Sequence, residues 1–182
     1  MPEIDPVLGW VAAIAAAAIF LASGVLKFYD LEAFRSAVAN YRILPSRLVT
    51  PFAWAVPTVE SAAAAGLLVA ATRPWPVLAL LGLLGAFTLA IVINLARGRT
   101  DIDCGCFGPA LRQRLSWRLL ARNGALFAML VIVLMPTGGR VINPLDDLSI
   151  GFAAPVVVLL YASLNILIAN AEGVRELRVA NG

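Results

Sequence analysis

The sequence contains no histidine, a single lysine (Lys27) and only two cysteines, Cys104 and Cys106. Without histidine the chain has no imidazole base and no imidazole metal ligand. A Walker-type phosphate loop is also excluded, because it needs its own Gly-Lys pair. Charged residues make up 14% of the 182 residues, whereas about 25% is usual in soluble domains. The chain therefore has too few charged groups for the surface of an ordinary soluble domain.

Hydrophobic residues are abundant instead, at 61% of the chain with a mean hydropathy of +0.89. A domain of this size cannot bury so much apolar surface in its own core, and a lipid bilayer is the alternative solvent. The net charge of +3 does not indicate nucleic acid, because the basic residues lie near the ends of apolar runs, as topology signals do. We therefore expect an integral membrane protein that does not bind nucleic acid.

Five apolar stretches are long enough to cross a bilayer, for which about 20 residues are needed. The runs are continuous rather than alternating, so they predict helices and not a β-barrel. The fourth run is the weakest, since Arg118 and Arg122 at its start would have to extend toward the interface. The sequence thus predicts one all-α membrane domain over residues 1–182, a polytopic helical bundle. The expected spans are 6–26, 52–71, 75–96, 118–136 and 150–171.

The segment 29–44 joins the first two spans and is expected to form a short amphipathic helix at the membrane interface. Asp30 is a suitable cap for it, and apolar residues then recur at helical spacing on one side. Upstream, Glu3 and Asp5 stand where a signal peptide has basic residues, so we expect the first span not to be a cleaved signal.

Basic residues gather in the loop after the first span, between the third and fourth spans, and in the C-terminal tail. The opposite loops carry only Arg73 and Arg140. The positive-inside rule then places the N-terminus outside and the C-terminus in the cytoplasm. It also places Cys104 and Cys106 on the cytoplasmic side.

Both cysteines lie in one polar loop, residues 97–117, within the stretch DIDCGCFGPA. Gly105 gives the backbone between them freedom, and Gly108 with Pro109 predicts a turn. A disulfide between residues two apart closes a small strained ring, which is easily reduced and therefore oxidising. This pattern favours thiol–disulfide exchange.

The charges around the two sulfurs act in both directions. Four arginines of the loop favour the reactive thiolate, as does the N-terminus of the following helix. Asp101 and Asp103 oppose it, because like charges repel. The residues do not show which sulfur attacks and which resolves. The four arginines are Arg97, Arg99, Arg112 and Arg114.

Other interpretations of the cysteine pair stay open. Two thiolates suit a soft metal such as Cu(I), so a transporter of soft metal or small thiols is one alternative. A structural link in a non-catalytic membrane anchor subunit is another. A structural zinc site takes four ligands, and only aspartates lie nearby, so no metal ligands are assigned.

Glu60 is a carboxylate inside the second span, where a charge is unfavourable and usually functional. A structural ion pair with Lys27 is the preferred interpretation, and a functional role is the alternative. Asn94 and Asn165 are expected to hydrogen-bond between helices.

Four segments together resemble the MauE branch of the DoxX-like membrane proteins, over roughly residues 9–136. They are FLASGVLKF, EAFRSAVANYRILP, PTVESAAAAGLLVAA and DIDCGCFG, and the Cys-Gly-Cys-Phe-Gly run is the specific part. The resemblance implies a membrane redox protein of methylamine utilisation that supports disulfide formation or rearrangement. Its implied client is the disulfide-rich small subunit of methylamine dehydrogenase, and its implied partner is a thioredoxin-like protein.

The resemblance carries the catalytic role over to Cys104 and Cys106. Whether the chain is itself an oxidoreductase enzyme is not decided by the residues, and a quinone is one candidate electron acceptor among other carriers. The candidate supporting residues are Lys27, Glu60, Asp103, Gly105, Phe107 and Gly108.

One expectation conflicts with another, because disulfides form in the envelope while the basic residues place the cysteine pair in the cytoplasm. Three explanations are compatible with the sequence. The pair passes electrons through the membrane, or the fourth span does not cross, or the loop folds into the bundle.

Overall fold

The computed structural model describes the backbone over residues 3–100, 102, 104 and 113–180, and the side chains as far as residue 171. Over these residues the chain is helical, and the predicted all-α class is confirmed. A 3-10 turn, η1 (Ala70–Thr72), joins the third and fourth helices. The helices are α1 (Pro6–Tyr29), α2 (Leu31–Asn40), α3 (Ser46–Gly66), α4 (Pro74–Ala96), α5 (Trp117–Leu134) and α6 (Pro144–Ala180).

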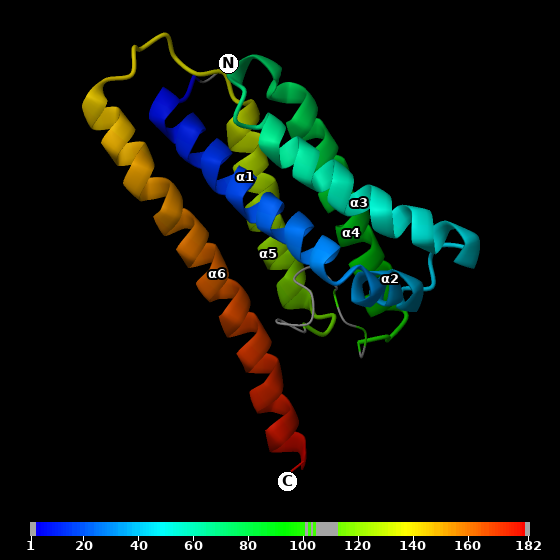
Figure 1. Ribbon diagram of the computed structural model, residues 1–182. Helices are drawn as coiled ribbons and strands as arrows, with labels where there is room; N and C mark the ends of the chain where they lie inside the picture. Colours follow the sequence, from blue (N-terminus) through cyan, green and yellow to red (C-terminus); the bar gives the residue numbers. More distant parts are fainter. Residues whose placement is uncertain (1–2, 101, 103, 105–112, 181–182) are drawn as a thin grey trace.

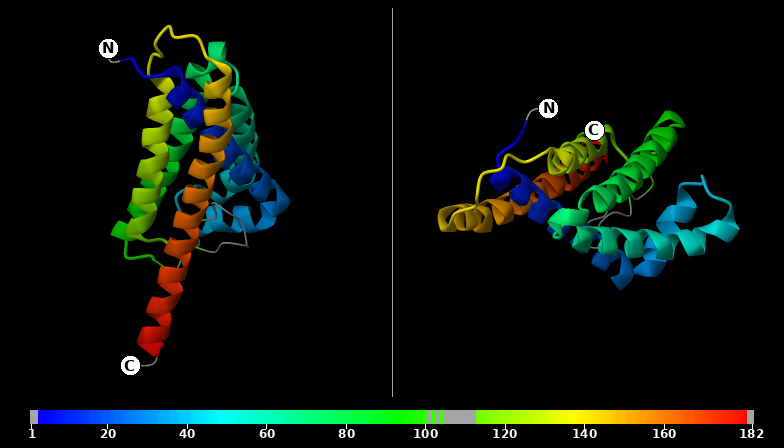
Figure 2. Two further views of the ribbon diagram at one scale, coloured as in Figure 1. Left: turned by 90° about the vertical axis from the view of Figure 1, so that its left-hand side faces the viewer. Right: turned by 90° about the horizontal axis from the view of Figure 1, so that it is seen from above.

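The helix α1 lies at the centre of the bundle, packed against α3, α5 and α6 (Figure 1). The bundle is completed by α4, which packs against α3 and α5. At the end opposite the N-terminus lies α2, and α6 continues past that same end to the C-terminus (Figure 2). The two termini therefore lie at opposite ends of the molecule, as an odd number of crossings requires.

The central position of α1 follows from its small side chains. Ala13 and Ala16 are fully buried and share a core with Ala64 of α3. Between membrane helices, small residues let the backbones approach closely, so that van der Waals packing holds the helices together. Leu80 of α4 and Leu130 of α5 complete this core.

Among the described residues, four helices are long and apolar enough to cross a membrane: α1, α4, α5 and the segment Pro144–Ala171 of α6. They coincide with four of the five predicted spans and support a multi-pass membrane protein. The remaining predicted span, 52–71, overlaps α3, which has 21 residues and a more polar sequence. Because α1 and α4 run in the same direction (Figure 1), the chain must return between them, and α3 provides this return. The count of five crossings stays a prediction.

The helix α3 lies earlier in the sequence than the predicted span 52–71, since it begins at Ser46 and ends at Gly66. Pro45 occupies the N-cap position, and its main-chain oxygen accepts a hydrogen bond from Leu48 N at 2.9 Å. At its end, a Cβ on Gly66 would lie 2.8 Å from Cγ of Pro76. The two helices therefore approach closely at this point, and the apolar residues that follow Gly66 form the turn into α4.

A helix, α2, forms within the segment 29–44 and is shorter than expected, and its place at the membrane interface stays a prediction. Asp30 caps it as predicted, with Oδ1 accepting a hydrogen bond from Ala33 N at 3.0 Å. The helix ends early because the chain reverses at Arg42, whose φ of 50° lies in the left-handed region. Phe34 and Val38 of α2 pack in a buried cluster with residues of α3.

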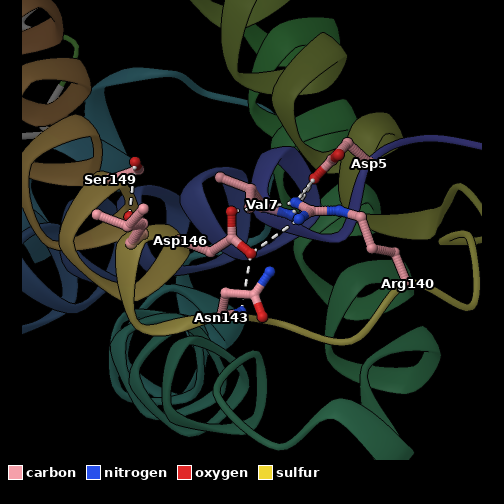
Figure 3. A network of polar contacts seen from close by, with 7 residues as sticks. Asp5, Val7, Arg140, Asn143, Asp146 and Ser149 are labelled. Atoms are coloured by element: carbon pink, nitrogen blue, oxygen red, sulfur yellow. Dashed lines mark hydrogen bonds and ion pairs between the residues drawn. The ribbon is translucent and has the colours of Figure 1, made fainter.

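Charged side chains hold the end of the bundle that carries the N-terminus (Figure 3). Asp5 caps α1, with Oδ1 accepting from Val7 N at 2.8 Å. Arg140, in the link between α5 and α6, donates to Asp5 at 3.1 Å and to the two carboxylate oxygens of Asp146 at 2.9 and 3.1 Å. The hydrogen bonds from Arg140 and Val7 hold the pKa of Asp5 below its usual 3.8. These contacts join the starts of α1 and α6.

Candidate functional site

Cys104 lies in the link between α4 and α5, and the described parts of this link are paired with each other. Cys104 N donates to Gln113 O at 2.8 Å, and Leu115 N donates to Ile102 O at 3.0 Å. All four residues are buried. The sequence left three explanations for the conflict between a cytoplasmic cysteine pair and disulfide formation in the envelope. The buried positions of these four residues agree with the third explanation, in which the loop folds into the bundle.

Arg122 of α5 is only 2% exposed, so the prediction that it extends to the interface is wrong. Its side chain stays inside because neighbouring amide oxygens accept its hydrogen bonds. Nη1 donates to Gln113 Oε1 at 2.9 Å and to Asn165 Oδ1 at 3.2 Å. Nε and Nη2 donate to Asn123 Oδ1 at 3.3 and 3.1 Å. Arg118, one turn earlier, is exposed as expected.

The guanidinium of Arg122 also reaches the cysteine, with Nη2 lying 3.8 Å from Cys104 Sγ. The residues Cys104, Gln113, Arg122, Asn123 and Asn165 form what we call the Arg122 cluster. Within it, Gln113 Nε2 donates to the main-chain oxygen of Asn165 at 3.0 Å. The cluster therefore brings together the link, α5 and α6 around one sulfur.

The two asparagines predicted to join helices behave differently. Asn165 of α6 does so, because its side chain accepts from Arg122 of α5. Asn94 of α4 instead donates to Ala90 O within its own helix and accepts from Arg99 of the link at 2.9 Å. Asn123 of α5 instead makes a side-chain hydrogen bond to α4, with its Nδ2 donating to Thr88 Oγ1 at 3.0 Å.

Two residues connect the C-terminal end of α2 with the link between α4 and α5. The hydroxyl of Tyr41 donates to the main-chain oxygen of Cys104 at 3.3 Å. Arg99 donates to the main-chain oxygens of Asn40 and Tyr41 at 2.9 and 3.4 Å. Arg99 was predicted to favour the thiolate, but its hydrogen bonds go to α2 and Asn94. Its role is therefore to position α2.

Lys27 and Glu60 form a buried ion pair between α1 and α3, as the sequence predicted, with Nζ 2.6 Å from Oε2. The ammonium also donates to Ser23 Oγ at 2.6 Å. The rings of Phe34 and Phe87 lie 5.6 and 5.9 Å from it, within the range of cation–π attraction. The two opposite charges therefore compensate each other, and both side chains are buried.

A small cavity of about 40 Å³ lies between this ion pair and the Arg122 cluster. Lys27 and Glu60 line it together with Arg122, Asn123 and Tyr161. A buried water needs roughly 10–15 Å³ and two to four polar partners. The cavity is therefore large enough for water that contacts both groups of charged residues.

A larger cavity of about 250 Å³ lies among α2, the link to α3, and α4, and we call it the apolar pocket. None of the described residues that line it carries a charged side chain. Cys104 forms part of its wall. The lining residues are Phe34, Ala37, Val38, Tyr41, Ile43, Leu44, Phe52, Ala86, Phe87, Leu89, Ala90, Ile93 and Cys104.

Several predicted site residues lie outside the described part of the chain: Asp103, Gly105, Cys106, Phe107 and Gly108. Within the described part, no group of three or more His, Cys, Asp or Glu side chains comes together. The sequence patterns did not indicate Arg122, Gln113 or Tyr41 as neighbours of Cys104. The available signal was the Arg122–Asn123 pair at the start of an otherwise apolar run.

Comparison with known proteins gives the family. The family described as "Methylamine utilisation protein MauE" matches residues 5–136. The "Methylamine utilization protein MauE" of Paracoccus versutus is 39% identical over 169 residues, covering 90% of this chain and 88% of the relative. The chain belongs to the MauE family.

Two further MauE proteins are similar over the same extent. That of Methylorubrum extorquens is 38% identical and that of Paracoccus denitrificans 35% identical, each covering 90% of this chain and 89% of the relative. The MauE match covers α1 to α5 and both cysteines, so the Arg122 cluster except Asn165 lies inside it. No solved structure matches this chain.

Proposed function

We propose that this MauE family member acts in methylamine utilisation as a membrane thiol–disulfide exchange protein, with Cys104 and Cys106 as the exchanging pair. The observation that carries the proposal is the guanidinium of Arg122, 3.8 Å from Cys104 Sγ inside the bundle. The names of the relatives supply the physiological context.

The chemistry of exchange needs a thiolate, because the thiolate is the nucleophile and the leaving group. Burial alone disfavours the charged sulfur. Arginine is charged at all ordinary pH values, and the oxygens of Gln113, Asn123 and Asn165 hold this one in place. Cys104 therefore has the cation that a reactive cysteine needs, whereas an inert structural cysteine needs none.

The burial of Cys104 supports different roles for the two cysteines in the proposed reaction. Cys104 is only 2% exposed, so the sulfur of a protein partner does not reach it without rearrangement. In the proposed reaction the partner's thiolate attacks Cys106, the Cys104–Cys106 bond breaks, and the electron pair stays on Cys104 beside Arg122. A second thiolate of the partner then attacks the mixed disulfide. The partner leaves with a disulfide, and the pair is left as a dithiol after taking up two protons.

The proposed partner is a thioredoxin-like protein, and the proposed client is the disulfide-rich small subunit of methylamine dehydrogenase. The test replaces each cysteine singly in cells grown on methylamine. Cys104→Ser leaves Cys106 without its resolving partner and should accumulate a mixed disulfide, visible on non-reducing gels and identifiable by mass spectrometry. Cys106→Ser should accumulate much less, because Cys104 is buried. A Cys104→Ser/Cys106→Ser variant is the control, and full growth of that variant on methylamine would overturn the proposal.

The proposed orientation places the N-terminus outside and the end with α2 and Cys104 in the cytoplasm. Its support is the gathering of basic residues at that end. In a variant without native cysteines, Gly139→Cys should react with a membrane-impermeant thiol reagent in intact cells, whereas Ser36→Cys should react only after permeabilisation. The reverse pattern would invert the orientation and place the exchange site at the envelope face.

A further inference from the structure

Among the residues that the structure describes, the lining of the apolar pocket includes one chemically reactive residue, Cys104, and the other lining side chains are apolar or, in Tyr41, aromatic with a hydroxyl. We infer that this pocket binds the ring of a lipid-soluble quinone, which re-oxidises the cysteine pair after exchange. The inference rests on the proposed function, since it supplies the electron acceptor that the exchange reaction requires.

The shape and polarity of the pocket match an uncharged ring. Its volume of about 250 Å³ lies just below the range of about 300–1,000 Å³ that is usual for drug-sized ligands, so it holds a single ring and not a whole lipid. The rings of Phe34, Phe52 and Phe87 line it, and aromatic rings pack well against another flat π-system. An ionised ligand would find no counter-charge among the described side chains that line the pocket.

The entrance suits a ligand that arrives through the bilayer. Three of the described lining residues are exposed: Ile43 in the link after α2 at 41%, and Ala86 and Leu89 of α4, the latter at 61%. The pocket therefore opens between that link and α4. Leu89 lies on a helix that is long and apolar enough to span the membrane, so this opening faces the lipid. A tail attached to the ring would leave through the opening into the acyl chains.

The redox step balances with a quinone of two carbonyl oxygens. The dithiol of Cys104 and Cys106 loses two electrons and two protons, and the sulfur–sulfur bond forms. The quinone gains both, so its two carbonyl oxygens become the hydroxyls of the quinol. Cys104, at the pocket wall, is the cysteine that would contact the acceptor, while Cys106 is the cysteine that the partner attacks in the proposed exchange.

The test uses the full-length protein, purified in lipid nanodiscs and reduced, in the absence of oxygen. A benzoquinone with a short isoprenoid tail is added, and quinol formation is followed by absorbance while thiol loss is followed by mass. We expect one quinol per pair of thiols lost. Ala86→Trp, which fills the pocket from α4, should slow quinol formation at least tenfold. Leu78→Trp is the control, because Leu78 lies on the same helix, is 54% exposed and does not line the pocket.

Two further measurements separate the inference from the proposed function. Exchange with oxidised glutathione should be equal in the wild type and Ala86→Trp. A photoreactive quinone should label peptides of α2 or α4, and unlabelled quinone should displace it while excess phospholipid should not. Normal exchange without quinol formation, equal slowing by both tryptophans, or displacement by phospholipid would overturn the quinone site and leave the exchange function standing. Loss of exchange itself in the wild type would overturn both.

Discussion

Arg122 Nη2 lies 3.8 Å from Cys104 Sγ, although eighteen positions separate the two residues in the chain. A buried arginine in a membrane bundle is unfavourable unless its donors are satisfied. Here the oxygens of Gln113, Asn123 and Asn165 accept its hydrogen bonds, so the charge is held at a defined place. The sulfur lies near the same guanidinium, on the Nη2 side. A fixed cation beside a buried sulfur is the arrangement that a thiolate requires.

Removing this cation should slow the chemistry of Cys104. In a Cys106→Ser background, Arg122→Gln should lower the rate of alkylation by iodoacetamide at neutral pH about tenfold. Arg122→Lys should recover part of the rate because it keeps the charge. Arg118→Gln, which removes an exposed arginine on the same helix, is the control, and an unchanged rate in Arg122→Gln would contradict the assignment.

The ion pair of Lys27 and Glu60 should affect the free energy of unfolding more strongly than an exposed ion pair does. Lys27→Met or Glu60→Gln leaves a buried charge without its partner, which costs about 3–5 kcal/mol of unfolding free energy. The double variant should be clearly more stable than the sum of the two losses predicts. The free energies of unfolding of the two single variants and of the double variant are measured in mixed micelles. The control is Arg35→Gln, which breaks the exposed Arg35–Glu32 pair and should change stability by at most about 1 kcal/mol. Strict additivity of the two buried substitutions would show that the charges do not interact.

The helices that the sequence predicts well are those defined by long uncharged runs. The spans predicted over 6–26 and 75–96 correspond closely to α1 and α4. Lipid requires an apolar surface on every side of a span, so composition alone marks these segments. The limits of α3 depend instead on the contact of Gly66 with Pro76, between two helices. Such a contact is not visible in the local pattern.

The candidate site was predicted only in part, for a similar reason. The pairing of Lys27 with Glu60 was predictable, because two opposite charges inside apolar segments have few other partners. The direction of Arg122 was not predictable, since a long side chain near the start of a span extends to the interface unless oxygen atoms accept its hydrogen bonds inside. Those oxygens come from Gln113 and Asn165, which lie in other parts of the chain. Tertiary structure therefore decides the position of the charge nearest to the sulfur.

The contact of Asp5 with Arg140 should make the N-terminal end of the bundle sensitive to acid. The pKa of Asp5 is lowered by folding, so its contribution to stability is present above its usual 3.8 and is lost as the pH falls through the lower folded value. The melting temperature of Asp5→Asn should therefore lie below that of the wild type at pH 7, and the difference should shrink as the pH falls below about 5. Asp147→Asn, an exposed carboxylate of α6, is the control. A difference that stays constant down to pH 3 would show that the charge of Asp5 contributes nothing.

The close approach of α1 and α3 at Gly24 should be specific to that position. A Cβ on Gly24 would overlap Ser61 Oγ and lie 3.3 Å from the main-chain oxygen of Pro57. Gly24→Ala should therefore lower the unfolding free energy by about 1–3 kcal/mol, as expected for overpacking. Gly82→Ala, where a Cβ meets nothing within 4 Å, should be neutral or slightly stabilising because alanine favours the helix. Adding Ser61→Ala removes the overlapping oxygen, so the Gly24→Ala/Ser61→Ala variant should regain part of the loss in the same unfolding measurement. If Gly24→Ala and Gly82→Ala behave alike, the two helices are not in close contact at this position.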